Sequence, residues 1–533
     1  MVDTITPEKT RQALDCSERQ VAVIDIREPL EYSRGHIRES TLVPRRDLEF
    51  RLPFVVPDGR ATIVLVDQHG ERGDQDADWL EFLGYDDVAY LVGGMSAWVT
   101  AGFEAIEAHE GVYATAFNFP SKDFGEQVQA EENIEQLQPE KLKAMLESDE
   151  DVLVTDVRTP EEFKSQTIPG ALNVEGVDLA LYVEQLRDRE QTVVVNCAGR
   201  TRSIIGTSSL KKLGFENVYE LENGTMGWEL AGYELERGAD RHVSDREVDE
   251  DELTELRANA VTLLRENDVP LLSVDEFESL RSDESELVYP VDVRTVKEYN
   301  DGHLPRSLSI PGGQAIQTTD EHFPVRNGSI VFISDDHVRA AITAYWFDRM
   351  GFSRVAVLKG GLEAWQAAGH SLEIGPDRRS PAAQALVEER ITVVSPGELA
   401  ELQSVDDPLI VDVGPSERFE ASHVPSARWV PRYDLEPWLR ENADPSRLIV
   451  VTSPKGRRAA YAAAAVQRYL EFEDVRALEG GMVAWEDSAR PLAEGTDGME
   501  FDPEDDVPKP YHQGDWAKRI YLEWEAELGE KYA

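Results

Sequence analysis

The sequence has few cysteines, no long apolar run and no leader pattern. Its 533 residues include two cysteines, Cys16 and Cys197, which are too few for a framework of disulfide bonds. No apolar run approaches the length of a membrane span, and the first residues lack the basic and then apolar regions of a signal peptide. These absences predict a soluble, cytoplasmic protein with no membrane partner.

Basic residues are also scarce. The chain has 54 lysines and arginines against 104 aspartates and glutamates, a formal net charge of -50. Because such a charge repels phosphates, we expect neither nucleic acids nor anionic membranes as partners. The acids are spread along the whole chain, which favours a halophilic surface, where high salt screens the self-repulsion. An ordinary acidic cytosolic protein with acidic linkers is the alternative.

Cofactor signatures are missing as well. The sequence contains no metal-ligand cluster, no phosphate-binding glycine loop and no dinucleotide fingerprint. We therefore expect no metal and no cofactor, so that the chemistry has to come from the chain's own side chains and backbone.

What the chain does contain is one signature in four copies. Each copy follows a short apolar run and pairs a glycine with a tryptophan one helical turn later, at 93–98, 223–228, 360–365 and 480–485. Apolar runs of this kind that alternate with helical patterns are typical of a parallel sheet covered by helices on both faces. Because the chain is also too long for one hydrophobic core, the repetition predicts four tandem α/β domains.

The repeats also predict where the domains begin and end. We place them at 1–108, 130–237, 265–375 and 385–494, followed by an acidic linker and a C-terminal helix at 495–533. Residues 109–136 and 237–252 are predicted to be linkers. In the C-terminal helix, expected from Asp515, the apolar residues Trp516, Ile520 and Trp524 share one face. We expect that face to dock on a neighbouring domain or subunit.

The second repeat places a cysteine where a strand meets a helix. The β-branched run 193–195 predicts a buried strand, and 203–213 predicts a helix. The loop between them begins at Cys197 and carries Arg200 and Arg202. Backbone N–H groups at such a junction form an anion site, and a thiol beside them and beside cations has a lowered pKa. We expect a reactive thiolate; the alternative, a buried structural thiol, is disfavoured by the two arginines.

The motifs of the second repeat resemble those of the rhodanese family of sulfurtransferases. The resemblance rests on Thr-Asp-Val-Arg-Thr-Pro-Glu-Glu-Phe at 155–163, Ile-Pro-Gly-Ala at 168–171, Cys-Ala-Gly-Arg-Thr-Arg-Ser at 197–203 and Glu-Asn-Gly-Thr-Met-Gly-Trp at 222–228. It implies four rhodanese-like domains and a sulfurtransferase. The enzyme would move sulfane sulfur from thiosulfate or a related donor, through a Cys197 persulfide, to cyanide or a thiol.

The resemblance also implies a site and partners. Cys197 is the expected nucleophile, and the expected substrate-binding residues are Arg158, Ala198, Gly199, Arg200, Thr201 and Arg202. Arg200 lacks an arginine counterpart in the other repeats, which makes it the better candidate for the donor's sulfonate. Arg202 recurs in every repeat and is favoured as structural, while Arg158 either orients the site or pairs with Asp156. The expected partners are a small-molecule donor and a thiophilic acceptor, with a homodimer or a protein acceptor left open.

The other repeats are expected to be inactive. The residues aligned with Cys197 are Asp67, Ser334 and Ser453, which are poor acceptors of sulfur. Three degenerate copies leave a sulfur-sensing or docking scaffold as the alternative function. A cysteine phosphatase is disfavoured, because its arginine follows the cysteine by six positions, where this chain has Ser203.

Overall fold

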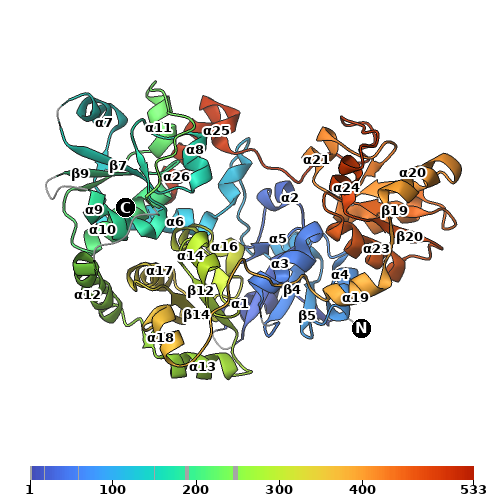
Figure 1. Cartoon of the computed structure of the whole chain (residues 1–533), viewed down its shortest axis with the longest axis horizontal. Coiled ribbons are helices and arrows are strands. Elements are labelled where there is room, and N and C mark those ends of the chain that lie inside the picture. Colours follow the sequence, from blue (N-terminus) through green and yellow to red (C-terminus); the bar gives the residue numbers. More distant parts are fainter. Residues whose placement is uncertain are drawn as a thin grey trace. The chain divides into compact units, whose positions relative to one another are not determined.

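The computed structural model describes residues 3–16, 19–57, 59–148, 150–186, 191–243 and 250–532. Within these ranges each repeat forms a five-stranded sheet whose paired strands run parallel, and the four sheets share one strand order. In each sheet the first strand of the repeat lies at one edge, followed by its fifth, fourth, second and third strands. Helices flank each sheet (Figure 1), so the predicted fold of four tandem α/β domains is confirmed. None of the helices in the described ranges combines the length and the hydrophobicity that a membrane crossing needs.

The chain divides into two compact units. The first comprises Met1–Gln12, Ala22–Ala105 and Ser380–Val507, and so contains most of repeat one and repeat four. The second comprises Ala13–Val21, Ile106–Arg379 and Pro508–Ala533, and contains repeats two and three with the C-terminal segment.

Repeats one and four have corresponding strands and helices, except that repeat four begins with an additional helix, α19 (Gln384–Arg390). The strands of repeat one, in sheet order, are β1 (Asp3–Ile5), β5 (Val88–Leu91), β4 (Thr62–Val66), β2 (Val21–Asp25) and β3 (Thr41–Leu42). Its helices are α1 (Pro7–Leu14), α2 (Pro29–Ser33), η1 (Arg45–Asp47), α3 (Leu48–Val55), α4 (Gly73–Phe82) and α5 (Gly94–Thr100). The strands of repeat four are β16 (Thr392–Val394), β20 (Val475–Leu478), β19 (Ile449–Thr452), β17 (Leu409–Asp412) and β18 (Arg428–Trp429). Its helices are α19 (Gln384–Arg390), α20 (Pro396–Val405), α21 (Ser416–Ala421), η4 (Arg432–Asp434), α22 (Leu435–Asn442), α23 (Arg457–Tyr469) and α24 (Gly481–Asp487).

Repeats two and three follow the same plan. The strands of repeat two are β6 (Gln136–Leu137), β10 (Val218–Leu221), β9 (Thr192–Asn196), β7 (Val152–Asp156) and β8 (Leu172–Asn173). Its helices are α7 (Pro139–Leu146), α8 (Pro160–Ser165), η3 (Gly176–Asp178), α9 (Leu179–Leu186), α10 (Thr201–Lys212) and α11 (Gly224–Leu230). The strands of repeat three are β11 (Leu271–Leu272), β15 (Val355–Leu358), β14 (Ser329–Ile333), β12 (Val288–Asp292) and β13 (Leu308–Ser309). Its helices are α12 (Glu250–Glu266), α13 (Val274–Ser282), α14 (Val296–Asp301), α15 (Gly312–Gln317), α16 (Thr319–His322), α17 (Val338–Arg349) and α18 (Gly361–Ala367).

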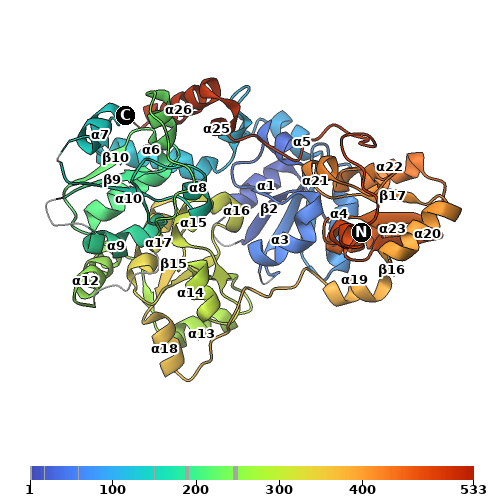
Figure 2. The same ribbon diagram turned by 45° about the horizontal axis from the view of Figure 1, so that its top comes forward.

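The segments outside the repeats differ from their prediction. Residues 109–136, predicted to be a linker, contain η2 (Tyr113–Ala116), α6 (Phe119–Glu132) and the start of β6. Part of the linker predicted at 237–252 lies outside the described residues. The C-terminal segment forms α25 (Pro510–Gln513) and α26 (Asp515–Glu530), and α26 packs along α6 (Figure 2) with Lys531 paired to Asp123 at 2.6 Å. The predicted helix therefore docks on its own chain.

The buried face of α26 is not the predicted one. Trp516 is 51% exposed, whereas Ala517, Leu522 and Glu525 are buried. The apolar pattern misled here because a charged side chain, Glu525, is drawn into the contact by partners that lie far away in the sequence.

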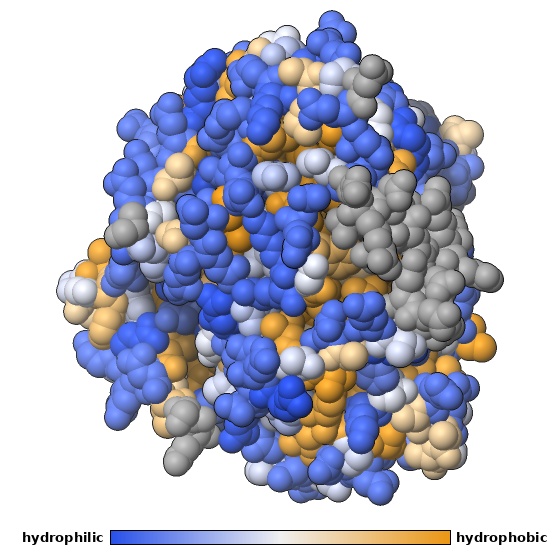
Figure 3. Space-filling view, turned by 90° about the vertical axis from the view of Figure 1, so that its left-hand side faces the viewer, coloured by the Kyte–Doolittle hydropathy of each residue, from blue (hydrophilic) through white to orange (hydrophobic). Residues whose placement is uncertain are grey.

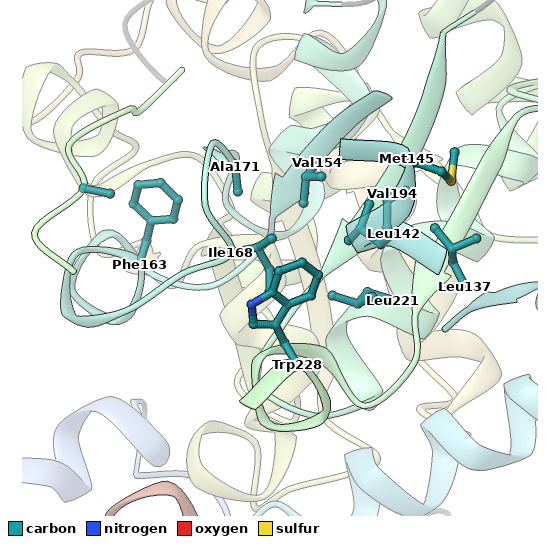
Figure 4. Packing of buried hydrophobic residues seen from close by; sticks show 11 residues of the cluster. Leu137, Leu142, Met145, Val154, Phe163, Ile168, Ala171, Val194, Leu221 and Trp228 are labelled. Atoms are coloured by element: carbon teal, nitrogen blue, oxygen red, sulfur yellow. The ribbon is translucent and has the colours of Figure 1, made fainter. Parts of the chain in front are cut away.

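The signature glycines and tryptophans have the same roles in each repeat. The four tryptophans are buried, and each indole N–H donates to a backbone carbonyl six residues later, at 2.9–3.1 Å. In repeat two, Trp228 packs with Ile168, Val194 and Leu221 in the core of the domain (Figure 4). The repeated tryptophan is therefore a core residue in each repeat.

Candidate active site

Cys197 lies at the carboxyl end of β9, where the chain enters α10. The strand and the helix follow the prediction, with the helix beginning at Thr201 rather than at Ser203. The amides of Thr225 and Met226, at the start of α11, donate to the carbonyls of Cys197 and Ala198 at 2.9 and 3.1 Å. Gly224, which directly precedes Thr225, has φ +53°, and a side chain there would collide with the Cys197 carbonyl. The signature glycine is therefore needed at this position so that the start of α11 can approach the cysteine loop and hydrogen-bond to it.

The amides of this loop form an anion cradle, which repeat one demonstrates. In repeat one the carboxylate of Asp67 accepts hydrogen bonds from the amides of Gly70 and Arg72, the latter at 3.1 Å. The corresponding amides in repeat two belong to Arg200 and Arg202, three and five residues after Cys197. Because the side chain of Cys197 is shorter than that of Asp67 and lacks its two oxygens, we infer that these two amides could bind an external anion instead.

We call the position aligned with Cys197 in each repeat the slot. In repeats three and four the side chain in the slot is hydrogen-bonded to its own loop. The hydroxyl of Ser334 accepts from the amide of Ala340 at 3.3 Å, and that of Ser453 accepts from the amide of Ala459 at 3.1 Å. These amides lie six residues after the slot, and in repeat two the amide at the same place, that of Ser203, donates to Cys197.

The thiol of Cys197 is buried, and this changes its expected ionisation. Its exposed fraction is 2%, and burial raises the pKa of Cys197, although Arg202 and Ser203 oppose the rise. The expectation of a lowered thiol pKa is therefore wrong for the site as the structure has it. The physical reason is desolvation, which outweighs the nearby charge.

Arg200 and Arg202 are placed differently from their expected roles. The guanidinium of Arg200 donates to both carboxylate oxygens of Glu126 in α6, at 2.6 and 2.7 Å. Arg202, favoured as structural, is the largest favourable charge on the Cys197 thiol and pairs with Glu162 at 2.7 Å. Burial disfavours the charge on Glu162, but Arg202 outweighs it and holds the pKa of Glu162 at about 2. The charge that acts on the thiol thus comes from Arg202.

Arg158 forms the ion pair that was one of its two expected roles. Its guanidinium bonds to Asp156 at 2.6 and 2.9 Å and donates to the carbonyl of Gln166. The same ion pair forms between Arg27 and Asp25 in repeat one and between Arg294 and Asp292 in repeat three. Its recurrence in repeats with no cysteine in the slot favours a structural role.

Helices α6 and α26 cover the loop. Thr201 donates to Glu525 of α26 at 2.9 Å, and Gly199 lies against Glu525 and Leu522. The second carboxylate oxygen of Glu525 is buried and has no hydrogen-bond partner among the described residues. From α6, burial lowers the pKa of Lys122 to about 8, with Glu525 opposing the shift.

Sequence reasoning missed three residues of the site: Glu126, Lys122 and Glu525. They lie outside the repeat pattern, so no alignment of the repeats could point to them. The described residues contain no group of three or more His, Cys, Asp or Glu side chains arranged to hold a metal ion.

Comparisons with known proteins agree with the repeat structure. The family described as "Rhodanese-like domain" matches residues 6–101, 138–231, 273–368 and 395–488. A crystal structure of thiosulfate sulfurtransferase from Pseudomonas aeruginosa is 33% identical, with a TM-score of 0.88 over 99% of this chain and 98% of that one.

Two curated relatives match single domains. Thiosulfate sulfurtransferase GlpE of Pseudoalteromonas translucida is 29% identical over 82 residues, which is 15% of this chain and 77% of the relative. A sulfurtransferase of Allochromatium vinosum is 28% identical over 99 residues, which is 19% of this chain and 92% of the relative.

Proposed function

The chain belongs to the rhodanese family of sulfurtransferases, and from that premise we propose that it moves sulfane sulfur from thiosulfate or a related donor to cyanide or a thiol. A Cys197 persulfide is the intermediate. The observation that carries the proposal is the cradle of repeat two. Its counterpart in repeat one binds a carboxylate, and Cys197 is the only cysteine among the four slots.

The reaction has two half-reactions. The thiolate of Cys197 attacks the outer sulfur of thiosulfate, the sulfur–sulfur bond of the donor breaks, and sulfite leaves with the electron pair. The acceptor then attacks the terminal sulfur of the persulfide, and the Cys197 thiolate is restored. Covalent catalysis of this kind predicts ping-pong kinetics.

The loop and Arg202 hold the anions in this proposal. The amides of Arg200 and Arg202 bind the terminal sulfur of the persulfide, as their counterparts bind Asp67. The charge of Arg202 stabilises the thiolate, and Ala198, Gly199 and Thr201 shape the cradle. Because Cys197 is 2% exposed, donor entry requires side chains of α6 or α26 to move aside.

Repeats one, three and four carry no sulfur in this proposal. Their slots hold Asp67, Ser334 and Ser453, whose side chains are already bonded to the amides of their own loops. Both cysteines are free, which fits a reducing compartment such as the cytoplasm.

Intact-protein mass spectrometry after incubation with thiosulfate tests the proposal. The parent protein should gain the mass of one sulfur atom, lose it on addition of cyanide, and show thiosulfate:cyanide sulfurtransferase activity. Cys197→Ser should abolish both, while Cys16→Ser should change neither, since Cys16 is exposed. Substantial turnover in a folded Cys197→Ser variant would overturn the proposal.

A further inference from the structure

A buried serine and a buried glutamate extend from the thiol of Cys197. The hydroxyl of Ser203 lies 3.2 Å from the Cys197 sulfur and 2.9 Å from a carboxylate oxygen of Glu220. Ser203 and Glu220 are both 0% exposed. The three side chains therefore form one hydrogen-bonded chain that has no contact with bulk water.

Several groups from the surrounding elements face Glu220. Gln136 of β6 donates to its second oxygen at 2.9 Å, Arg200 lies near it at the start of α10, and Glu126 adds a like charge from α6. The Ser203 hydroxyl has a second acceptor, the carbonyl of Arg200 at 2.8 Å. Burial raises the pKa of Glu220 to about 8, with Arg200 opposing the shift, so this carboxyl can hold a proton near neutral pH.

The chain of three groups occurs only in the repeat that has the cysteine. The counterparts of Ser203 in the other repeats are Gly73, Ala340 and Ala459. Those of Glu220, four residues before the signature glycine, are Tyr90, Val357 and Ala477. A fold that is built four times needs neither residue for its own stability. Their joint presence beside Cys197 therefore points to the chemistry of the thiol.

We propose that Glu220, acting through Ser203, accepts and holds the proton of the Cys197 thiol. The step starts from the ionised form of Glu220: the sulfur–hydrogen bond breaks, the Ser203 oxygen takes that proton, and the Ser203 hydroxyl proton passes to the Glu220 carboxylate. The result is a thiolate, an unchanged serine and a neutral carboxylic acid. The proton returns along the same path when the thiol is restored.

The consequence is a reactive site with one negative charge instead of two. A thiolate beside an ionised Glu220 would repel an anionic donor, whereas a thiolate beside the neutral acid presents only its own charge. This inference rests on the proposed function and deepens it, because it explains how a buried thiol can react with a dianion. Ser203 is then a catalytic residue, and Glu220 is a positioning residue that acts through it.

The test uses two alkylating agents of equal shape, anionic iodoacetate and neutral iodoacetamide, on a Cys16→Ser background. Because both reach Cys197 by the same path, the rate with iodoacetate divided by the rate with iodoacetamide cancels the effect of access. This ratio reports the charge around the thiolate. In the parent the rate with iodoacetate relative to that with iodoacetamide should fall as the pH rises above about 8, where Glu220 beside the thiolate loses the proton that it holds. In Glu220→Gln, which cannot ionise, the fall should be smaller, because only other groups such as Lys122, whose pKa is also about 8, still titrate there. A ratio with the same pH dependence in both proteins would overturn the proposal.

Variants of Ser203 give a second measurement. Ser203→Ala should slow both alkylations about tenfold or more at neutral pH, since a hydrogen bond to a charged group is lost. Ser203→Thr keeps the hydroxyl and should restore the rate. Ser208→Ala is the matched control, because Ser208 lies on the same helix and donates to Glu132 away from the thiol. Equal alkylation rates in the parent and in Ser203→Ala would overturn the proposed proton relay from Cys197 through Ser203 to Glu220.

Folding and sulfur transfer are separated from the relay in this design. Alanine fits at position 203, because repeats three and four carry it there, and Glu220→Val reproduces the residue of repeat three if Glu220→Gln does not fold. A parallel pH dependence in parent and Glu220→Val would also overturn the relay. Alkylation consumes no sulfur donor. If the persulfide fails to form while the ratio behaves as expected, the proposed function fails and the relay stands.

Discussion

At the residue scale, each slot side chain decides what the loop amides hold. Asp67 fills its own cradle with a carboxylate, whereas Ser334 and Ser453 each use one amide. Cys197 is bonded to the amide of Ser203 in the same way as the two serines, but it also receives the charge of Arg202. The slot side chain thus decides whether the loop holds a carboxylate, a hydroxyl or a thiol.

The two arginines of the loop should differ in their effects. Arg202→Ala should raise the thiosulfate KM about tenfold or more and raise the pKa of Cys197 further, because the largest favourable charge on the thiol is lost. Arg200→Ala should instead lower the free energy of unfolding by about 3–5 kcal/mol, because Glu126 stays buried without its partner. Steady-state kinetics and urea unfolding of both variants make the comparison. A donor KM that depends on Arg200 alone would reverse the assignment.

The signature glycine should be essential for the geometry of the loop. Gly224→Ala should destabilise the protein by about 1–3 kcal/mol beyond the cost of a positive φ, because its methyl group would meet the Cys197 carbonyl. Gly232→Ala is the control, since Gly232 has φ +87° and nothing within 4 Å of the added methyl group. Thermal unfolding and Cys197 alkylation are measured for both. Equal destabilisation would show that only backbone strain matters.

The ionisation of Cys197 marks the limit of sequence reasoning at this scale. The pattern of strand, cysteine and arginines predicts an anion cradle, and the hydrogen bonds of Asp67 support one. The same pattern predicts a lowered thiol pKa, which is wrong because burial of the thiol in the folded chain raises it. Desolvation depends on segments that lie far away in the sequence, so the loop residues alone cannot reveal it.

At the element scale, the repeats could be predicted and the segments between them could not. The sheets could be predicted from the short apolar runs and the four buried tryptophans. Strands of this length depend mainly on their own apolar side chains and on a helix that covers them. Helix α6 was missed because its charged buried residues, such as Glu126, hide its amphipathic pattern. Its partner is Arg200, and only the folded chain brings the two together.

The carboxylate of Glu525 on α26 should compete with the anionic donor for the N-terminal end of α10. The carboxylate of Glu525 lies at the N-terminal end of α10, where the helix dipole favours an anion. Glu525→Gln keeps a hydrogen-bond acceptor for Thr201 but removes the charge, so the thiosulfate KM should fall several-fold. Glu523→Gln, on the exposed face of the same helix, is the matched control for net charge. If both variants change KM equally, Glu525 acts only through long-range charge.

At the scale of the whole molecule, charge is the dominant property. The face of the chain in Figure 3 is mostly covered by hydrophilic residues, with apolar ones between them. With 104 acidic residues and 54 basic ones, pairing one to one would still leave an excess of 50 carboxylates, the formal net charge of -50. Arg200 and Arg202 are each already paired with a glutamate, so the site offers little long-range attraction to a dianion.

Added salt should therefore raise both stability and activity. At 0.01 M salt the Debye length is about 30 Å and the carboxylates repel one another across the chain, whereas at 1 M it is about 3 Å and most of that repulsion is screened. The melting temperature and kcat/KM for thiosulfate should both rise with potassium chloride. Sulfate should raise the melting temperature as well, yet inhibit at lower concentration than chloride, because an oxyanion competes for the cradle. Stability and activity that both peak in dilute buffer and fall steadily with potassium chloride would contradict the prediction of a halophilic surface.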